Sequence, residues 1–309
     1  MRVVVTGGAG FIGRWIVASL LARGDEVVVI DDLSNGSMAN LAEFRADPHL
    51  HVVRGDVADP KAVVDAFAGG ADLAIHLAAV IEVQKSLVDP ARSVDVNVGG
   101  TANVLEACRA GDVRATFVST CMVYDMASAR GSISESHPVK PVSPYAATKL
   151  AAEHLTLAYG HAYGLPVSVV RPFNTYGPFQ KANQEGGVVA VFVRRALRKE
   201  PLEVFGDGTQ TRDFLYVDDC VDLILRACES KAALGEVLNG GSGRDIAVND
   251  LARLVGGPDG EVVHVSHPHP QSEIQKLRAD ARKAAKLLGW RPSVSLEDGL
   301  ARLRRWMAP

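Results

Sequence analysis

The sequence predicts an α/β fold built on a doubly wound parallel sheet, with a smaller, discontinuous C-terminal lobe. Short apolar runs alternate with helical patterns through the first half of the chain, which is the order of repeated β-α-β units. The runs are apolar without interruption, as strands buried on both faces of a sheet are. After about residue 173 the rhythm changes to glycine- and proline-rich turns, which indicates a second lobe.

Six strands are predicted from these runs, and helices from the segments between them. The strands begin at Val3, Val27, His51, Leu73, Ala115 and Val167. Helices are expected over residues 11–23, 91–110 and 144–163, where apolar residues recur at helical spacing.

The C-terminal part of the chain is divided between the two lobes. A strand-like segment, EVLNGG from Glu236, is a candidate to return to the main sheet, and the segment HVSHPHP breaks regular structure. We therefore expect one domain to contain residues 1–173 and about 214–242. The other should contain about 174–213 and 243–309.

Composition excludes several classes of partner. Of the 309 residues, 47% are hydrophobic and 22% charged, and the net charge of −3 includes no long run of one sign, so neither nucleic acid nor a membrane is expected as a partner. The four cysteines form no C-x-x-C pair, and neither a secretion signal nor an apolar stretch of about 18 residues is present, so we expect the cytoplasm. The histidines of HVSHPHP lack cysteines or carboxylates at ligand spacing, so no metal is expected.

A glycine motif follows the first predicted strand and opens the first helix. Gly7, Gly10 and Gly13 give the spacing G-x-x-G-x-x-G. Glycine is needed where the backbone turns tightly and approaches a pyrophosphate, which then meets the helix N-terminus. Asp31 and Asp32 end the second strand, where an acid accepts hydrogen bonds from ribose hydroxyls. A dinucleotide is expected, and NAD is favoured over NADP because a 2′-phosphate would meet like charge.

A second constellation carries redox chemistry. Tyr145 and Lys149 stand four residues apart in a predicted helix, so both side chains project from one face. A lysine ammonium beside a tyrosine lowers the pKa of the phenol and makes it a usable base for an alcohol proton. The pair alone occurs by chance on many helices. Thr120, at the end of the fifth strand, stands at about the sequence distance that places it beside Tyr145.

A series of motifs matches one known family in order: TGGAGFIG, DDLSNG, GDV, HLAA, NVGGTANVLEAC, VY, SPYAATK, RPFNTYGP, GDGTQTRDFLYVDD and KAAKLLGWRP. With these motifs the chain resembles the extended short-chain dehydrogenase/reductase family, in particular its nucleotide-sugar epimerases and dehydratases. The likeness extends over nearly the whole chain and implies a Rossmann domain, NAD and a UDP-sugar substrate. It also implies a homodimer through helices 91–110 and 144–163, with packing inside one chain as the alternative.

The resemblance implies roles for individual residues. Tyr145 would be the base, Lys149 would lower its pKa and hold the nicotinamide ribose, and Thr120 would bond the sugar hydroxyl that is oxidised. Asn174 would contact the substrate. Asp56 would hold the adenine edge, with a strand-end cap as the alternative. The residues expected to contact NAD are Gly7, Gly10, Phe11, Ile12, Gly13, Asp31, Asp32, Asn35, Gly36, Asp56, Val57, Leu77, Ala78, Ala79, Asn97, Tyr145 and Lys149.

One part of the resemblance concerns the diphosphate of the substrate. Arg212 would pair with it, because a guanidinium offers fork-like donors to phosphate oxygens. A structural ion pair with Asp213 or Asp218 is the alternative. Members of the family carry a further arginine where this chain has Pro270, and His269 is a candidate to replace it.

Further departures concern the sugar and the reaction. Leu277 stands where glucose-specific epimerases carry a tyrosine, which favours an N-acetylated hexosamine, with a packing leucine as the alternative. In 4,6-dehydratases an Asp-Glu pair follows the catalytic threonine, whereas here Cys121 and Met122 follow it, and methionine can neither take nor give a proton. The segment STCMVYD is most similar to the UDP-N-acetylglucosamine 5,6-dehydratase of tunicamycin biosynthesis, which oxidises C4 transiently and returns the hydride.

Two residues are candidates for the base that takes the C5 proton. Cys121 would serve if its pKa is lowered, with a small buried hydrophobe as the alternative. Glu82, after the fourth strand, is the second candidate acid/base, with a plain loop carboxylate as its alternative. Two other functions stay open: a UDP-glucose or UDP-N-acetylglucosamine 4-epimerase, and a non-catalytic NAD-binding protein, against which the intact Thr120, Tyr145 and Lys149 argue.

Overall fold

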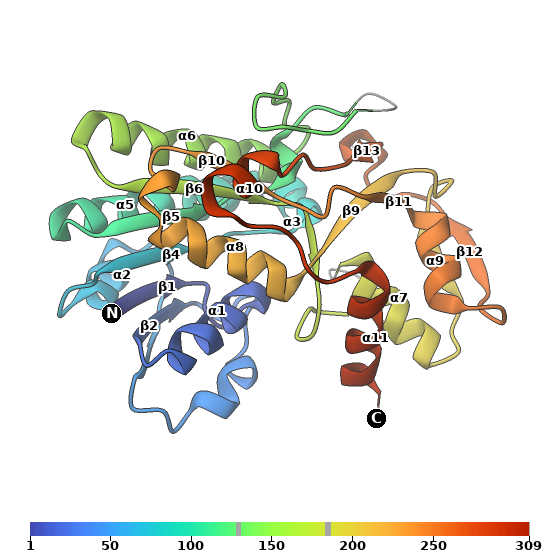
Figure 1. Ribbon diagram of the computed structural model, residues 1–309, viewed down its shortest axis with the longest axis horizontal. Helices are drawn as coiled ribbons and strands as arrows, with labels where there is room; N and C mark the ends of the chain where they lie inside the picture. Colours follow the sequence, from blue (N-terminus) through green and yellow to red (C-terminus); the bar gives the residue numbers. More distant parts are fainter. Residues whose placement is uncertain (128–130, 183–186, 309) are drawn as a thin grey trace.

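A seven-stranded parallel sheet forms the centre of the protein (Figure 1). The computed structural model describes residues 1–127, 131–182 and 187–308. The strand order is β10-β6-β5-β4-β1-β2-β3, and every neighbouring pair is parallel. The strands are β1 (Arg2–Thr6), β2 (Glu26–Asp31), β3 (Leu50–Arg54), β4 (Leu73–His76), β5 (Arg114–Val118), β6 (Val167–Pro172) and β10 (Val237–Gly240). The six predicted strands and the return of EVLNGG to this sheet are confirmed.

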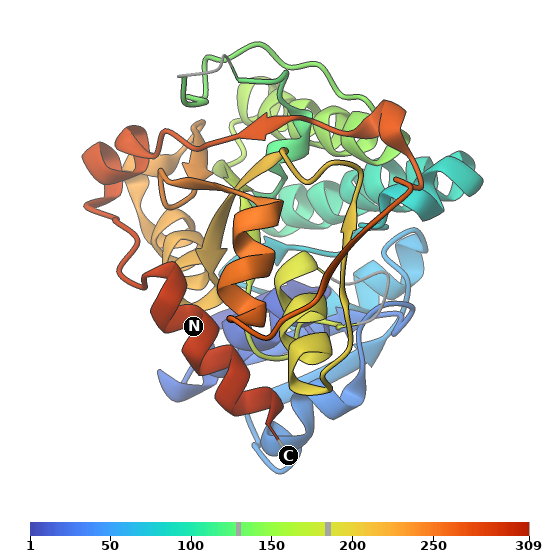
Figure 2. The ribbon, with the colours of Figure 1, turned by 90° about the vertical axis from the view of Figure 1, so that its right-hand side faces the viewer.

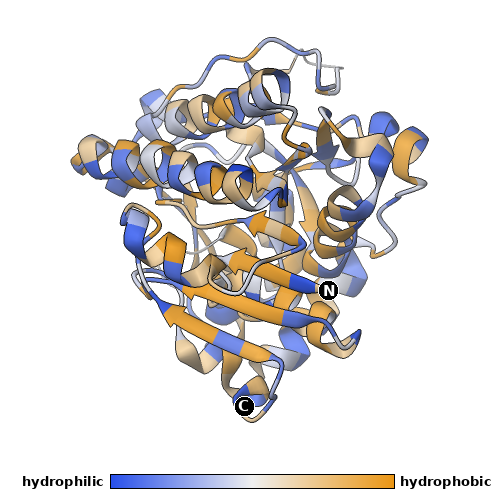
Figure 3. Ribbon diagram, turned by 90° about the vertical axis from the view of Figure 1, so that its left-hand side faces the viewer, coloured by the Kyte–Doolittle hydropathy of each residue, from blue (hydrophilic) through white to orange (hydrophobic). Residues whose placement is uncertain are grey.

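Helices cover both faces of the sheet. They are α1 (Phe11–Ala22), α2 (Pro60–Phe67), α3 (Val83–Val88), α4 (Pro90–Val94), α5 (Gly100–Gly111), α6 (Pro144–Tyr163), α8 (Val217–Glu229) and α10 (Arg282–Leu288). Val3 and Val5 of β1 pack in one apolar cluster with α1 and α8, whereas Val4 between them packs with α2 and α5. Successive side chains of a strand point to opposite faces, so burial of both faces explains the uninterrupted apolar runs. Figure 3 shows these strands coloured mostly as hydrophobic.

The predicted helix over residues 91–110 contains a π turn. One unbroken helical run consists of α4, a π-helical turn over Asp95–Gly99, and α5. In this turn Asn97 accepts a hydrogen bond from the Val80 backbone N–H and donates to the Val80 carbonyl and to Thr148 Oγ1. A π turn redirects a side chain within a helix, and here it aims Asn97 at the loop after β4. The helix predicted over residues 91–110 is confirmed, with a π turn that the sequence did not predict, and the helices predicted at 11–23 and 144–163 are confirmed as α1 and α6.

A second lobe lies beside the sheet, on the right in Figure 1 and toward the viewer in Figure 2. It contains β7 (Asn174–Tyr176), α7 (Val188–Leu197), β8 (Leu202–Phe205), β9 (Thr211–Tyr216), β11 (Asp245–Ala247), α9 (Val248–Gly256), β12 (Val262–Val265), β13 (Lys276–Leu277) and α11 (Leu296–Met307). Strands β11, β9, β13 and β7 form one sheet, and β12 pairs with β8 in another. Among the described residues, no helix combines the length and apolar character needed to cross a membrane.

Two details of the lobe boundaries differ from the expected ranges. Strand β9 stays in the second sheet up to Tyr216, so the chain rejoins the main domain at Val217 rather than at about residue 214. Helix α10, expected in the second lobe, packs against α8 and β10 of the main domain. Turn composition marks a change of lobe but does not reveal which sheet a later helix covers.

Asp219 ties α8 to the segment that precedes α11. Its carboxylate is 4% exposed and accepts hydrogen bonds from the backbone N–H groups of Ser293 and Val294 and from the Ser293 hydroxyl. Its backbone carbonyl accepts a hydrogen bond from Trp290 Nε1. A buried carboxylate that satisfies several donors stabilises the fold because those donors would otherwise lack partners.

We expect Asp219→Ala to lower the free energy of unfolding by about 2–4 kcal/mol, because it leaves buried donors unsatisfied. Urea denaturation followed by circular dichroism measures this. The control is Asp222→Ala on the same helix, which removes an exposed ion pair with Arg226 and should cost about 0.5 kcal/mol or less. If Asp219→Ala lowers the free energy of unfolding no more than Asp222→Ala does, Asp219 does not stabilise the contact between α8 and the segment before α11.

Candidate active site

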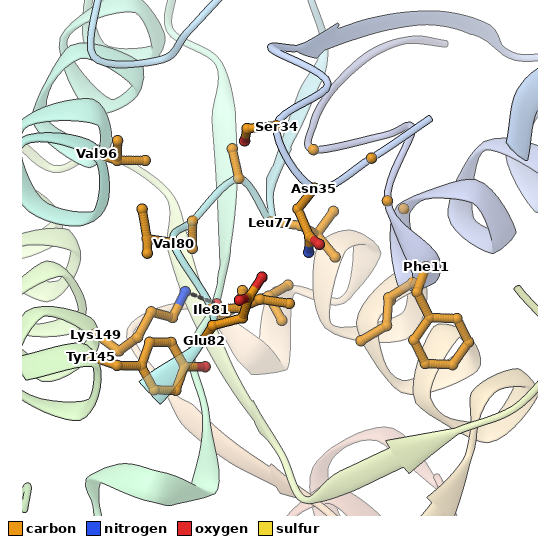
Figure 4. Close-up of a pocket in the computed structure, with 18 of the residues that line it drawn as sticks. Phe11, Ser34, Asn35, Leu77, Val80, Ile81, Glu82, Val96, Tyr145 and Lys149 are labelled. Carbon is orange, nitrogen blue, oxygen red and sulfur yellow. Dashed lines mark hydrogen bonds between the residues drawn. The ribbon is translucent and has the colours of Figure 1, made fainter. Parts of the chain in front are cut away.

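A cavity of about 750 Å³ runs along the carboxyl ends of the main strands. Segments after β1, β2, β3, β4, β5 and β6 line it, together with α6. It passes between β4 and β1, where the strand order reverses and where open α/β sheets bind ligands. The cavity brings together every predicted NAD-contacting residue except Asn97, and also Thr120, Glu82 and Asn174. Figure 4 shows part of this lining.

Several lining residues were not identified from the sequence. They include Ser34, Val80, Ile81, Lys85, Arg92, Ser119, Thr175 and Gln180. Ser119 and Thr175 are sequence neighbours of the predicted residues Thr120 and Asn174, and this adjacency could have identified them. Lys85 and Arg92 lie in the short helices α3 and α4, and no spacing in the sequence indicates that these helices border the cavity.

The glycine motif forms a tight turn that a larger residue would block. Gly7 has φ = +70°, and its N–H donates to the Ile30 carbonyl at 2.8 Å. A Cβ atom on Gly13 would collide with the carbonyl oxygen of Gly7 and with the backbone of Gly8. This close packing of helix α1 on the turn directs the first backbone N–H groups of the helix toward the cavity, where a pyrophosphate fits.

The two acidic residues after β2 are held in different ways. Asp31 is 6% exposed, and its carboxylate accepts hydrogen bonds from the Ala9 and Leu33 backbone N–H groups, both at 2.9 Å. Burial raises the pKa of Asp31. Asp32 accepts hydrogen bonds from the N–H and hydroxyl of Ser34 and is more exposed. The glycine turn and these acids fit the pyrophosphate and ribose of NAD.

Tyr145 and Lys149 project together from α6, which begins with Pro144 at its first position and Ser143 as N-cap (Figure 4). Lys149 Nζ donates to the Val118 carbonyl at 2.5 Å and lies 4.2 Å from the centre of the Phe117 ring. Thr120, directly after β5, also lines the cavity. The three residues expected to act on the sugar hydroxyl are therefore brought together from two elements.

Burial decides the pKa values of this pair. It raises the pKa of Tyr145 to about 12, against which a hydrogen bond from Thr120 acts. It lowers the pKa of Lys149 to about 7, and the Glu153 carboxylate opposes this shift. The expectation that Lys149 lowers the pKa of Tyr145 is not met in the protein alone, because the lysine is itself desolvated and directs its ammonium at the Val118 carbonyl.

The positions that carry the acid and base of 4,6-dehydratases are packed into the core here. Cys121 is 3% exposed and lies in an apolar cluster with Val123, Phe173 and Leu277, and Met122 packs against the same cluster. Burial raises the pKa of Cys121 to about 12. Neither residue lines the cavity. The prediction of Cys121 as a base of lowered pKa is therefore corrected: it occupies the position as a small buried hydrophobe.

Glu82 is the candidate acid/base that does reach the cavity. It directly precedes α3, its side chain is 10% exposed, and its Oε1 accepts a hydrogen bond from Lys85 Nζ at 2.8 Å. Glu82, Tyr145 and Lys149 line the same cavity and are labelled in Figure 4. A carboxylate that lines the cavity can exchange protons with a molecule bound there.

The residues predicted to bind the substrate diphosphate form a cluster in the second lobe. Arg212 pairs with Glu273, not with Asp213 or Asp218 as the structural alternative supposed. His267 bonds the same Glu273 at 2.6 Å, and the ring of His269 lies 4.9 Å from that of His267. The described residues contain no group of three or more His, Cys, Asp or Glu side chains that could hold a metal ion.

The cavity separates the predicted substrate residues into two sets. Asn174 lines it, and its amide donates to the Asp213 carbonyl at 3.4 Å. Arg212, His269 and Leu277 do not line it. Leu277 is fully buried in the same apolar cluster as Cys121, as the packing alternative expects. Asn97, expected at the cofactor, instead braces Val80 and Thr148 behind the cavity wall.

A comparison with protein families shows to which family the chain belongs. Residues 3–241 match the model of the NAD dependent epimerase/dehydratase family. The chain belongs to this family. The predicted family, the Rossmann-type fold and the use of NAD are thereby confirmed, and the protein is an NAD-dependent nucleotide-sugar epimerase or dehydratase.

Individual relatives cover the whole length of the chain. It is 38% identical to a UDP-glucose 4-epimerase of Mycolicibacterium smegmatis over 98% of this chain and 97% of the relative. It is similar in structure to Pal from Bacillus thuringiensis, with 50% identity, a TM-score of 0.97 and 99% coverage of both chains. The NAD complex of a Thermus thermophilus UDP-glucose 4-epimerase gives 34% identity, a TM-score of 0.90 and 99% coverage of both. Other relatives include dehydratases and decarboxylases.

We expect Gly13→Ala to weaken NAD binding at least about tenfold, because the added methyl group collides with the backbone of the turn. Isothermal titration with NAD measures the loss. Gly99→Ala is the control, because a Cβ atom there meets nothing within 4 Å in a helical segment. Unchanged NAD affinity in the Gly13 variant would show that the turn does not approach the cofactor.

Proposed function

We propose that the protein is a UDP-N-acetylglucosamine 5,6-dehydratase that acts through transient oxidation of C4. The observation that carries this proposal is the position of Glu82 in the cavity with Tyr145 and Lys149, while Cys121 and Met122 are packed away from it. An enzyme that eliminates water needs an acid/base besides the tyrosine, whereas an epimerase does not. Glu82 supplies that extra group.

The first step belongs to the pair on α6. NAD, held by the residues around the glycine turn, would supply a reversible hydride acceptor for C4 of the sugar. Tyr145 takes the proton of the C4 hydroxyl, and Thr120 holds that hydroxyl. Lys149 would hold the nicotinamide ribose, and residues around the glycine turn would hold the rest of the dinucleotide. The hydrogen bond from Thr120 opposes the effect of burial on the pKa of Tyr145.

The second step uses the acidity that the C4 ketone gives to C5. Glu82 takes the C5 proton, the electrons of that C–H bond form the C5–C6 double bond, and the C6 hydroxyl leaves with a proton from Glu82. Water is the only molecule lost. Tyr145 would return its proton to O4, and NAD would serve as the donor of hydride to C4, so the product would be a 5,6-ene and no net oxidation would occur.

The N-acetylated sugar and the nucleotide rest on the likeness of the STCMVYD segment to the tunicamycin-pathway enzyme. The homodimer and the cytoplasmic location stay predictions.

A 4-epimerase acting on UDP-glucose or UDP-N-acetylglucosamine is the second candidate, favoured by the identity of 38% to the Mycolicibacterium smegmatis enzyme over almost the whole chain.

We expect Tyr145→Phe to reduce turnover by roughly two orders of magnitude or more, because it removes the base and keeps the ring. Tyr159→Phe on the same helix is the matched control, since it loses only an outward hydrogen bond to Glu106. Turnover with a nucleotide sugar and NAD affinity are measured for both variants. Near-normal turnover in the Tyr145 variant would eliminate the redox mechanism.

The reaction itself is tested by mass spectrometry of UDP-N-acetylglucosamine and, separately, UDP-glucose after incubation with the protein. We expect a product of UDP-N-acetylglucosamine that is lighter by one water. Glu82→Gln should slow its formation about 100-fold or more, while Cys121→Ala retains most of the rate. A product of unchanged mass would support the epimerase. Loss of water that survives in Glu82→Gln but not in Cys121→Ala would restore the cysteine as the base.

A further inference from the structure

Three carboxylates line the part of the cavity at the ends of β2 and β3, where the adenosine of NAD fits. They are Asp31, Asp32 and Asp56. Taken alone, this acidic end repels a 2′-phosphate and selects NAD strongly. The cation Arg92 reaches the same end from α4 and also lines the cavity.

Arg92 bridges two of the three acids. Its Nη2 lies 2.5 Å from Asp56 and 3.8 Å from Asp32, and the side chain is 41% exposed. The same nitrogen, Nη2, makes both of these contacts. The backbone of Arg92 is fixed, because its N–H donates to the Asp89 carboxylate at 2.9 Å in the cap of α4.

This arrangement changes the charge that a dinucleotide meets. A guanidinium presents several donors in a plane and is a preferred partner of phosphate, and an arginine near the ribose is the usual means of accepting a 2′-phosphate. The Asp31 carboxylate already accepts hydrogen bonds from the Ala9 and Leu33 N–H groups. The negative charge near the ribose that a cation can still neutralise is therefore that of Asp32. Arg92 is the residue placed to compensate it.

We infer that Arg92 is a specificity-determining residue of the cofactor site, which gives the protein a measurable affinity for NADP and keeps its preference for NAD smaller than the acidic residues alone would make it. NAD remains the tighter ligand because the carboxylate of Asp32 stays beside the ribose. The inference concerns binding and is independent of the reaction catalysed.

A different role for Arg92 makes a different prediction. If its only effect is to hold Asp56 against the adenine, its removal weakens NAD and NADP equally, because both contain the same base. If it acts on the 2′-phosphate, its removal weakens NADP selectively. The ratio of the two dissociation constants therefore separates the roles without any measurement of turnover.

The experiment is titration of NAD and NADP into wild-type protein, Arg92→Met and Arg92→Lys. We expect wild type to bind both, NAD more tightly, and Arg92→Met to weaken NADP about tenfold with a change for NAD below about threefold. Arg92→Lys should retain part of the NADP affinity. The control is Arg109→Met, which removes an arginine of similar exposure that pairs with Glu106 away from the cavity.

Three results overturn the inference: no NADP binding by the wild type, an equal loss for both dinucleotides in Arg92→Met, or an unchanged NADP affinity in that variant. Salt gives an independent check. Raising the ionic strength should reduce the NADP affinity of the wild type more than that of Arg92→Met, because screening acts on the charge pair that the variant lacks.

Discussion

Burial of the parallel sheet on both faces is the constraint on which the rest of the structure depends. Val3, Val4 and Val5 of β1 are all fully buried although they point to opposite faces. A charged side chain inside such a strand would be buried, at a large desolvation cost. Chemistry is therefore confined to the segments beyond the strand ends, and the parallel direction of all the strands collects those segments at one edge.

Two polar groups inside the sheet, Thr6 and His76, help to fix this edge. His76, at the end of β4, lies 2.6 Å from Thr6 Oγ1 through Nδ1 and 2.9 Å from Thr101 Oγ1 through Nε2. Burial lowers the pKa of His76 to about 3, so the ring is neutral. Thr6 Oγ1 also accepts hydrogen bonds from the N–H groups of Leu77 and Ala78, which line the cavity. A neutral, fully bonded histidine thus holds the wall after β4 in place.

The sequence allowed prediction of those features that depend on local pattern. Apolar runs gave the strands, and the glycine spacing gave the turn, because both reflect constraints that act within a few residues. The π turn at Asn97 depends on partners in the β4 loop and in α6, and no local pattern encodes them. Arg92 was missed for the same reason, since its partners Asp32 and Asp56 are far away in sequence.

The roles of Cys121 and Glu82 depend on side-chain direction, which alignment with a family does not give. Thr120 caps the short turn that follows β5 by accepting a hydrogen bond from the Met122 N–H. In this turn Cys121 packs among Phe173 and Leu277, where the thiolate has no solvation and its pKa is raised. Glu82 precedes α3 and lines the cavity, and it pairs with the half-exposed Lys85. A group that exchanges protons with a bound sugar must line the cavity, so the carboxylate is better suited to the task than the buried thiol.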